Sequence, residues 1–192
     1  GDAIVVDTGM DPGPIDRCLR RLGIERIRLL VFSHADADHV AGWRGAVRGR
    51  EVEHVMVGPS GGPELPDVPR STPGPGESVM VGEVEIETLW PDTDHPATDR
   101  NDASLVQRFT INGVRVLFTG DLGEQTQTRV AAREDVTADV LKVPHHGSAD
   151  QSARFHQQTG AVAPPVSVGE HGFGHPPRRS MQILRDAGNR PW

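Results

Sequence analysis

The chain has 192 residues, enough for one well-filled core, whereas two independent domains of half that size would each be small, so we expect a single domain over residues 1–192. Aromatic residues make up only 4% and Tyr is absent, which favours a core of Val, Ile, Leu and Ala, as in sheets covered by helices. The formal net charge of −7 excludes a broadly basic, histone-like surface, although acids that bind divalent metal ions would be neutralised locally.

The first half of the chain begins with a predicted strand, helix and strand. Residues 3–6 are apolar and end at Asp7-Thr8-Gly9. Ile15, Cys18, Leu19 and Leu22 then follow the i, i+3, i+4, i+7 spacing of an amphipathic helix that ends at Gly23. Residues 27–32 predict a buried strand. The charged residues after Phe32 therefore lie at its C-terminal end, where α/β folds commonly place their chemistry.

Further elements follow in order. We expect a short helix at 40–47, a strand at 52–57, a surface loop at 58–76, and two strands at 79–90 that turn near Gly82. After an acidic loop at 91–102, strands at 104–111 and 114–118 form a hairpin through Asn112-Gly113. Helices are predicted at 123–133, 149–158 and 178–187, and strands at 140–143 and 161–168. Pro164 and Pro165 place the last strand at a sheet edge. This pattern suggests two stacked sheets with helices outside.

Metal-ligand residue types follow three of the predicted strands. They are His34, Asp36, Asp38 and His39 after the first, Asp121 after the second, and His145 or His146 after the third, with His175 as a fourth possibility. In an extended segment His34 and Asp36 point the same way. One segment can thus supply ligands to two metal ions held about 3.5 to 4 Å apart, with Asp121 as the natural bridge.

Each of these residues also has a structural interpretation. Taken alone, Asp38 is more simply a helix N-cap. Adjacent histidines such as His145 and His146 are more often one ligand and one structural residue, and which of the two binds metal stays open. The remaining histidines, His54, His95, His156 and His171, are assigned to surface or packing roles. The joint occurrence of H-x-D-x-D-H, T-G-D and P-H-H-G-S, each after an apolar run, favours the metal site.

At these motifs the chain resembles the metallo-β-lactamase superfamily, and within it the C-terminal domain of the ComEC family of competence proteins, which take up DNA across bacterial membranes. The matching segments run in family order. They are residues 1–3 with Val6 to Gly9, Ser33 to His39, Asn101 to Val106, Phe118 to Asp121, Val140 to Ser148, and Ser167 to Gly169 leading to Gly174 to Pro176.

The resemblance implies an α/β, four-layer αβ/βα sandwich of two mixed sheets with helices outside. It also implies a dinuclear site with two divalent metal ions, Mn or Zn, held by His34, Asp36, Asp38, His39, Asp121 and His145. Asp36 stands where the superfamily usually has a second histidine. A carboxylate there is a harder ligand and shifts the preference from zinc towards manganese.

The activity implied by the resemblance is a metal-dependent phosphodiesterase or nuclease that degrades the DNA strand that is not imported. Asp38 and His175 would be catalytic, while Asn101, His146 and Ser148 would bind substrate. Without a visible basic-aromatic platform, DNA recognition is expected to be directed at the backbone of a single strand. Two alternatives stay open: a small-molecule or cell-wall phosphodiesterase resembling phosphorylcholine esterases, and a catalytically silent metal-binding domain that assists DNA binding.

Location is inferred from what the sequence lacks. The single cysteine, Cys18, excludes an intrachain disulfide, and no run approaches the roughly 18 apolar residues of a membrane span. The chain starts at Gly1 without Met or a signal peptide, so we expect a soluble fragment of a longer protein. The ComEC resemblance implies a parent in the bacterial cell membrane, with this domain extracytoplasmic and the parent's membrane channel as its partner. No soluble protein partner is evident.

Overall fold

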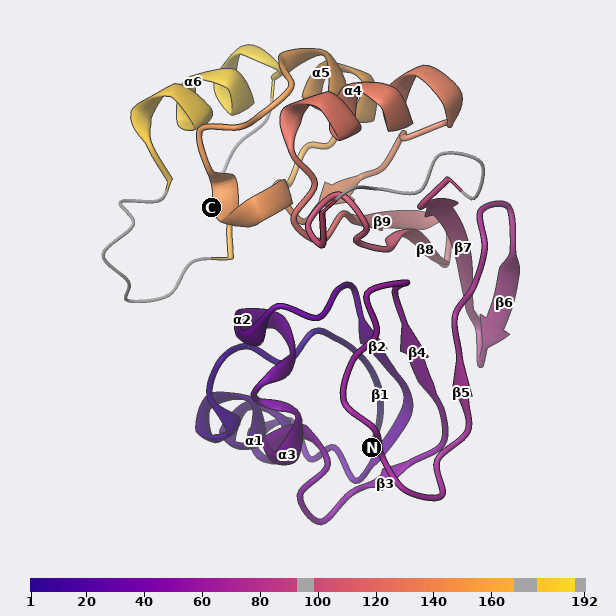
Figure 1. Ribbon diagram of the computed structural model, residues 1–192. Helices are drawn as coiled ribbons and strands as arrows, with labels where there is room; N and C mark the ends of the chain where they lie inside the picture. Colours follow the sequence, from indigo (N-terminus) through magenta and orange to yellow (C-terminus); the bar gives the residue numbers. More distant parts are fainter. Residues whose placement is uncertain (93–98, 168–175, 189–192) are drawn as a thin grey trace. The chain divides into compact units, whose positions relative to one another are not determined.

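Two five-stranded sheets organise the chain (Figure 1). The computed structural model describes residues 1–92, 99–167 and 176–188, and the chain divides into two compact units, Gly1–Pro73 and Gly74–Trp192. Each sheet, with the helices that cover it, belongs to one unit, and each unit has its own apolar core.

The sheet of the first unit is entirely parallel. Its strands are β1 (Asp2–Val6), β2 (Arg26–Phe32), β3 (Glu51–Val52), β4 (Val55–Val57) and β5 (Arg70–Ser71). They follow the order β1-β2-β4-β5, and β3 also pairs with β2. The ends of parallel strands meet at one edge, so the residues after β1 lie beside those after β2. The backbone N–H of Asp7, for example, donates to the carbonyl of Val31 at 2.8 Å.

Three helices complete the first unit, and in Figure 1 they lie on one side of its sheet. They are α1 (Pro12–Arg21), α2 (Ala37–Val40) and α3 (Trp43–Ala46). Leu19 of α1 and Ala46 of α3 share an apolar core with Leu30 and Phe32 of β2. Where the sequence predicted one helix at 40–47, the structure has α2 and α3, and where it predicted one strand at 52–57, the structure has β3 and β4.

The predicted inner face of α1 is partly wrong. Leu19 is buried as expected, but Cys18 and Leu22 are exposed, and Asp16 is buried in their place. Asp16 is buried because it forms ion pairs with arginines, among them Arg50, which is more than thirty residues away in the sequence. The spacing of apolar residues along α1 cannot predict this ion pair between Asp16 and Arg50.

The sheet of the second unit is mixed. Its strands are β6 (Ser78–Val81), β7 (Val84–Trp90), β8 (Val106–Ile111), β9 (Val114–Phe118) and β10 (Val140–Leu141), in the order β10-β9-β8-β7-β6. Only β9 and β10 pair in parallel. The predicted Asn112-Gly113 hairpin is confirmed, with φ of 50° and 79° at the two turn residues. In the predicted strand at 161–168, the described residues contribute a single bridge, from Ala163 to Val140.

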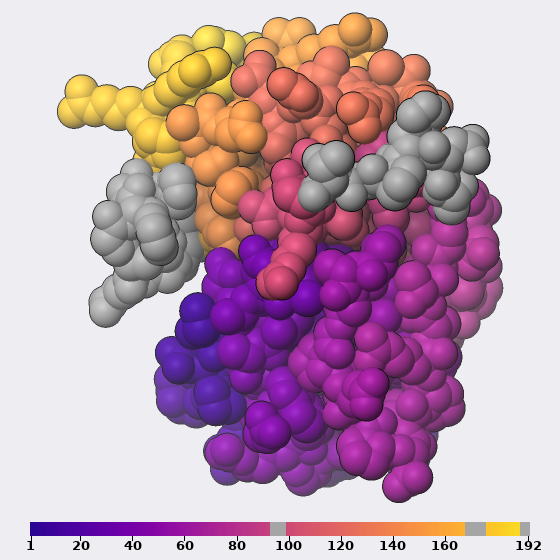
Figure 2. All heavy atoms as spheres, viewed as in Figure 1, coloured from indigo at the N-terminus to yellow at the C-terminus, as the bar shows by residue number. Residues whose placement is uncertain are grey.

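The helices of the second unit are α4 (Glu124–Arg133), the 3-10 turn η1 (Pro144–Gly147), α5 (Ala153–Thr159) and α6 (Arg178–Asp186). Val130 of α4 and Phe155 of α5 pack with Leu117 of β9 in one core. Orange α5 and yellow α6 form part of this unit's outer surface in Figure 2. Among the described residues, every helix is too short or too polar to cross a bilayer.

Candidate functional site

The predicted ligands of the first unit gather where β2 ends. Asp36 occupies the N-cap of α2, and its carbonyl accepts hydrogen bonds from the backbone N–H groups of His39 and Val40. Its side chain forms no capping hydrogen bond. One Asp36 carboxylate oxygen instead lies 3.9 Å from Nε2 of His34. The two side chains point the same way, as the extended segment predicted, and Asp38 is exposed on the first turn of α2.

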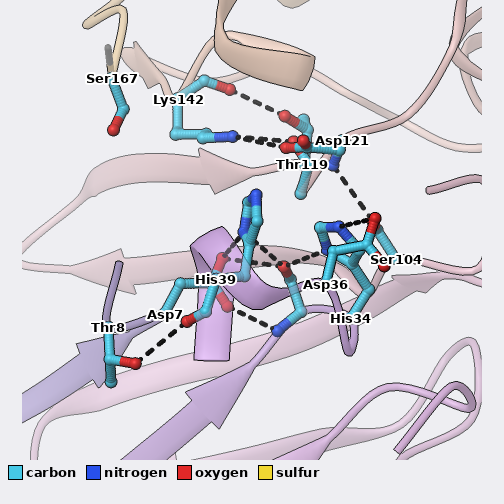
Figure 3. Close-up of polar contacts among 12 residues, drawn as sticks. Asp7, Thr8, His34, Asp36, His39, Ser104, Thr119, Asp121, Lys142 and Ser167 are labelled. Carbon is cyan, nitrogen blue, oxygen red and sulfur yellow. Dashed lines mark hydrogen bonds and ion pairs between the residues drawn. The ribbon is translucent and has the colours of Figure 1, made fainter. Parts of the chain in front are cut away.

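Asp7 orients His39. Its carboxylate lies 2.8 Å from Nδ1 of His39 and accepts two more hydrogen bonds from the backbone N–H and hydroxyl of Ser33, both at 2.8 Å (Figure 3). Burial raises the pKa of the Asp7 carboxyl, but the hydrogen bonds from His39 and Ser33 outweigh it and hold the pKa below its usual value. An ionised carboxylate can only accept, so Nδ1 of His39 carries the hydrogen and Nε2 carries the lone pair.

The same reasoning extends to His34. Ser33 uses its only hydroxyl hydrogen on Asp7, and Nδ1 of His34 lies 3.1 Å from the Ser33 oxygen. Nδ1 of His34 must therefore be the donor, which makes Nε2 its lone-pair nitrogen as well. The two imidazoles are buried, with ring centroids 4.1 Å apart. Asp7 thus sets the tautomer of both histidines, one directly and one through Ser33.

In the second unit, Asp121 follows β9 and is buried. Its backbone N–H donates to the hydroxyl of Ser104 at 3.1 Å. The ammonium group of Lys142 donates to the carbonyl of Gly120 at 2.8 Å and to Oδ1 of Asp121 at 3.2 Å (Figure 3). Lys142 therefore fixes Oδ1 of Asp121. Because the carboxylate is rigid, the direction of Oδ2 is fixed as well.

His146 lies against that other oxygen. Its Nε2 is 3.3 Å from Oδ2 of Asp121, and its Nδ1 donates to the backbone carbonyl of Ser167 at 2.7 Å. The contact with Asp121 raises the pKa of His146, against the opposing effect of burial. A carbonyl can only accept, so Nδ1 carries a hydrogen. The carboxylate of Asp121 also only accepts, so the ring donates through Nε2 as well, and a metal ion bound at Nε2 would take the place of that hydrogen.

The histidine pair sits in an unusual backbone. His145, His146 and Gly147 have φ of 48°, 51° and 69°, all in the left-handed region. This conformation costs roughly 1 to 2 kcal/mol for each residue with a Cβ. Strain of this kind is typical of functional sites, where the surroundings fix it.

The remaining predicted site residues are more dispersed. Asn101 is half-buried, and its carbonyl accepts the N–H of Ser104 at 3.0 Å. Ser148 is buried, and its hydroxyl accepts the N–H of Asp150 at 3.3 Å. His175 lies outside the described residues.

Four contacts were not foreseen. They are made by Asp7 with His39, Ser33 with His34, Ser104 with the backbone of Asp121, and Lys142 with the carboxylate of Asp121. Asp7 had a usable signal, because it follows a strand that is the parallel neighbour of β2. Lys142 had one too, as the only lysine in the chain, two residues before the Pro144-His145-His146 segment.

Taken unit by unit, the donors after β2 and those around Asp121 are of the kinds that bind divalent metal ions. Each of the three imidazoles, His34, His39 and His146, donates from Nδ1 to an oxygen acceptor, which leaves Nε2 as the nitrogen that would bind a metal ion. This is the arrangement that metal-binding histidines adopt, with an outer carboxylate or carbonyl fixing the ring. The neighbouring carboxylates of Asp36 and Asp121 add oxygen donors, and a mixed nitrogen and oxygen set suits zinc or manganese.

Sequence comparison relates the chain to competence proteins. It is 26% identical to ComE operon protein 3 of Bacillus subtilis (strain 168) over 183 residues, which cover 85% of this chain and 23% of that protein. It is also 26% identical to the competence protein ComA of Neisseria gonorrhoeae over 193 residues, covering 97% of this chain and 25% of that protein. The chain therefore spans about a quarter of the length of these relatives.

Structural comparison agrees on the fold. The metallo-β-lactamase fold protein YhfI from Bacillus subtilis has a TM-score of 0.61 and 14% identity to the chain, and covers 97% of this chain and 82% of its own. At the family level, the profile of the metallo-beta-lactamase superfamily matches residues 1–155. The chain therefore belongs to the metallo-β-lactamase superfamily, whose members are mostly metal-dependent hydrolases, and the predicted fold class is confirmed.

Proposed function

We propose that the chain is a metal-dependent phosphodiesterase that cleaves DNA, as one domain of a ComEC-like DNA-uptake protein. The observation that carries this proposal is the shared orientation of His34, His39 and His146, each of which donates from Nδ1 to an oxygen acceptor and would present Nε2 to a metal ion. Membership of a superfamily of mostly metal-dependent hydrolases and the similarity to competence proteins support the reaction class and the substrate.

The ligands we propose are those expected from the sequence. His34, Asp36, Asp38 and His39 of the first unit and Asp121 of the second would serve one reaction, together with one histidine of the 145–146 pair. The contact between His146 and Asp121 favours His146 as that ligand. Two bound Mn or Zn ions would supply hydroxide near neutral pH and polarise the phosphoryl oxygens.

The protein's own groups would complete the reaction. Asp38 is exposed and ionisable, which suits a group that accepts a proton from the attacking water. His175 and the non-ligating histidine of the pair are candidates to protonate the leaving oxygen. Asn101 and Ser148 would hydrogen-bond the scissile phosphate. Asp7 keeps His34 and His39 in the tautomer that presents Nε2.

The proposed substrate is the single strand of DNA that is not imported. Its contacts would be made mostly to phosphates, so binding would weaken steeply as salt increases. The proposed partner is the membrane channel of the parent protein, on the extracytoplasmic side. The similarity to proteins about four times as long as the aligned region supports a larger parent.

A substrate comparison tests this function. The chain is purified without chelators, its metal content is measured, and cleavage of labelled single-stranded DNA is compared with hydrolysis of bis-p-nitrophenyl phosphate in Mn and in Zn. The proposal predicts DNA cleavage with the metal found. Turnover of the small ester alone would favour a small-molecule or cell-wall phosphodiesterase, and bound metal without cleavage of either substrate would indicate a silent metal-binding domain.

A further inference from the structure

The buried carboxylate of Asp16, in the first unit, forms ion pairs with three arginines. Oδ2 of Asp16 accepts from Arg20 and, at 3.2 Å, from Arg48, while Oδ1 accepts from Arg50 at 3.2 Å. Burial raises the pKa of the Asp16 carboxyl, but the three guanidinium groups outweigh it and hold the pKa below its usual value. Asp16 is therefore ionised at neutral pH. Three positive charges then face one negative charge, which leaves a local excess of two.

Arg50 makes this cluster rigid. Its side chain is only 2% exposed, and besides Asp16 it donates to the carbonyls of Ile24, Gly45, Ala46 and Arg48. These bonds tie the end of α1 to the turn after α3. Arg50 is thus a structural residue, and the carboxylate it pairs with is held in place.

Arg20 and Arg48 differ from Arg50, because their side chains are 65% and 58% exposed. Each is anchored through one nitrogen on the same Asp16 oxygen. A guanidinium group has five N–H donors in a planar fork, so most of their donors still face solvent. The two groups are therefore held close together without being neutralised.

Three more exposed arginines lie on the same two segments of the chain, Arg17, Arg21 and Arg44, the last with its guanidinium group 4.6 Å from the centroid of the Trp43 ring. Arg17, Arg20 and Arg21 fall at i, i+3 and i+4 on α1, so they share one side of the helix, and Arg44 precedes Arg48 by four residues. All five are exposed. Residues 12–24 and 41–50 contain no acid other than Asp16. We name these five arginines the guanidinium face. The dark blue atoms of the segment that carries α1 lie on the surface of the first unit in Figure 2.

We propose that the guanidinium face binds the phosphate backbone of a nucleic acid strand, as a docking surface distinct from the residues that follow β2. Anchored guanidinium groups suit phosphate, because their forks match its oxygens and little side-chain entropy remains to be lost on binding. The partner class rests on the proposed function. In a chain with a net charge of −7, this concentration of unneutralised arginine is a local exception.

A membrane surface fits the same face less well. The apolar residues Ile15 and Leu19 of α1 pack against the unit's own core, whereas an interfacial helix buries its apolar side among lipids. Met10 and Leu22 are exposed, but they lie outside the ends of the helix. The exposed side of α1 itself therefore offers guanidinium groups, which bind backbone phosphates.

Binding is tested with a matched pair of double variants. The metal-loaded chain is titrated with a fluorescent, phosphorothioate-protected oligothymidine at several salt concentrations. Arg20→Gln with Arg48→Gln should weaken binding by about tenfold or more and reduce the slope of log K against log salt by about 1.4, or 0.7 for each lost phosphate contact. Arg26→Gln with Arg28→Gln removes the same charge from a site balanced by Asp2 and Glu53, and should change binding much less.

The only cysteine provides a footprint. Cys18 is exposed on α1, within three residues of Arg17, Arg20 and Arg21. The oligonucleotide should slow alkylation of Cys18 in the unaltered chain and much less in the Arg20/Arg48 variant. Equal binding and equal protection in both proteins would overturn the inference, as would protection of Cys18 by anionic phosphatidylglycerol vesicles but not by DNA.

The experiments distinguish an error in the proposed docking surface from an error in the proposed reaction. Hydrolysis of bis-p-nitrophenyl phosphate should be unchanged in the Arg20/Arg48 variant, since that ester is too small to need a docking surface. If DNA is cleaved but the variant binds it normally, the docking surface is wrong and the reaction stands. If the unaltered chain binds DNA through this face but cleaves nothing, the reaction is wrong and the docking surface stands. A melting temperature close to that of the unaltered chain shows that the variant is folded.

Discussion

The carboxylate of Asp7 lies 2.8 Å from Nδ1 of His39 and also accepts both the N–H and the hydroxyl of Ser33. These contacts join the end of β1 to the end of β2. They fix the tautomer of His39 directly and that of His34 through the Ser33 hydroxyl. A residue that need not touch a metal therefore determines which nitrogen two proposed ligands present.

Asp7→Asn is expected to weaken metal binding about 10- to 100-fold, the usual cost of losing an outer-shell partner. An amide has one oxygen, so its NH₂ group must face either Ser33 or Nδ1 of His39. Facing His39, it would drive the hydrogen of that ring onto Nε2. Competition with a chelator of known affinity measures the change.

Asp11→Asn is the matched control, because Asp11 lies in the same connection between β1 and α1 but its side chain forms no capping hydrogen bond. It should bind metal as the unaltered chain does. Equal metal affinity in the Asp7 and Asp11 variants would show that Asp7 does not set the ligand tautomers.

Lys142→Met is expected to lower DNA cleavage by at least about tenfold with little loss of folding. Lys142 bonds Oδ1 of Asp121 and thereby fixes Oδ2 towards His146, and an interaction of this kind to a charged group is worth about 1.5 to 3 kcal/mol. Lys142→Arg keeps the charge and should restore part of the rate. Steady-state cleavage by both variants, with circular dichroism as a folding check, tests the role. A fully active Lys142→Met protein would exclude it.

Acid should destabilise the second unit through His156. This histidine of α5 is fully buried, its Nε2 bonds Gln151, and burial lowers its pKa to about 4. The unfolded value is about 6.5, so the unfolded chain takes up the proton first as the pH falls. The stability is complete above about pH 6.5, and about 3 kcal/mol is lost between there and pH 4. Urea unfolding across this range should show the loss, and His156→Gln should remove its contribution to the slope.

Gly45→Ala should destabilise the first unit by about 3 kcal/mol, because overpacking of a rigid contact has a cost of this order. A Cβ at this position would lie 1.9 Å from the carbonyl oxygen of Pro12, a backbone atom of α1. Gly13→Ala is the comparison, since the nearest atom there is the flexible end of Arg17 at 3.1 Å. Denaturant unfolding of the two variants measures the difference. Equal stability would mean that α1 and α3 pack less closely than described.

Local signals predicted local structure well. The Asn112-Gly113 turn, for example, needs only its own two residues to adopt positive φ. The buried run of β2 likewise predicted where His34, Asp36 and His39 would gather, because a strand end is defined by its own sequence.

Contacts between distant segments were not predictable in this way. The inner face of α1 depends on Arg48 and Arg50, which lie beyond the next strand. The orientation of His39 depends on Asp7. The contact of His146 with Asp121 depends on a left-handed backbone at His145 and His146, which the sequence of that segment does not predict. These features arise from packing and hydrogen bonds that no single segment contains.

The proposed function requires ligands from both units to serve one metal-dependent reaction, and the cleavage rate of labelled single-stranded DNA measures whether they do. The unaltered chain is compared with His39→Ala and Asp121→Ala, each loaded with the metal found in the purified protein. Either substitution alone should abolish cleavage, and the double variant should be no worse than either one, as for residues that act as a unit. Metal-dependent cleavage that persists at the original rate in Asp121→Ala would contradict it.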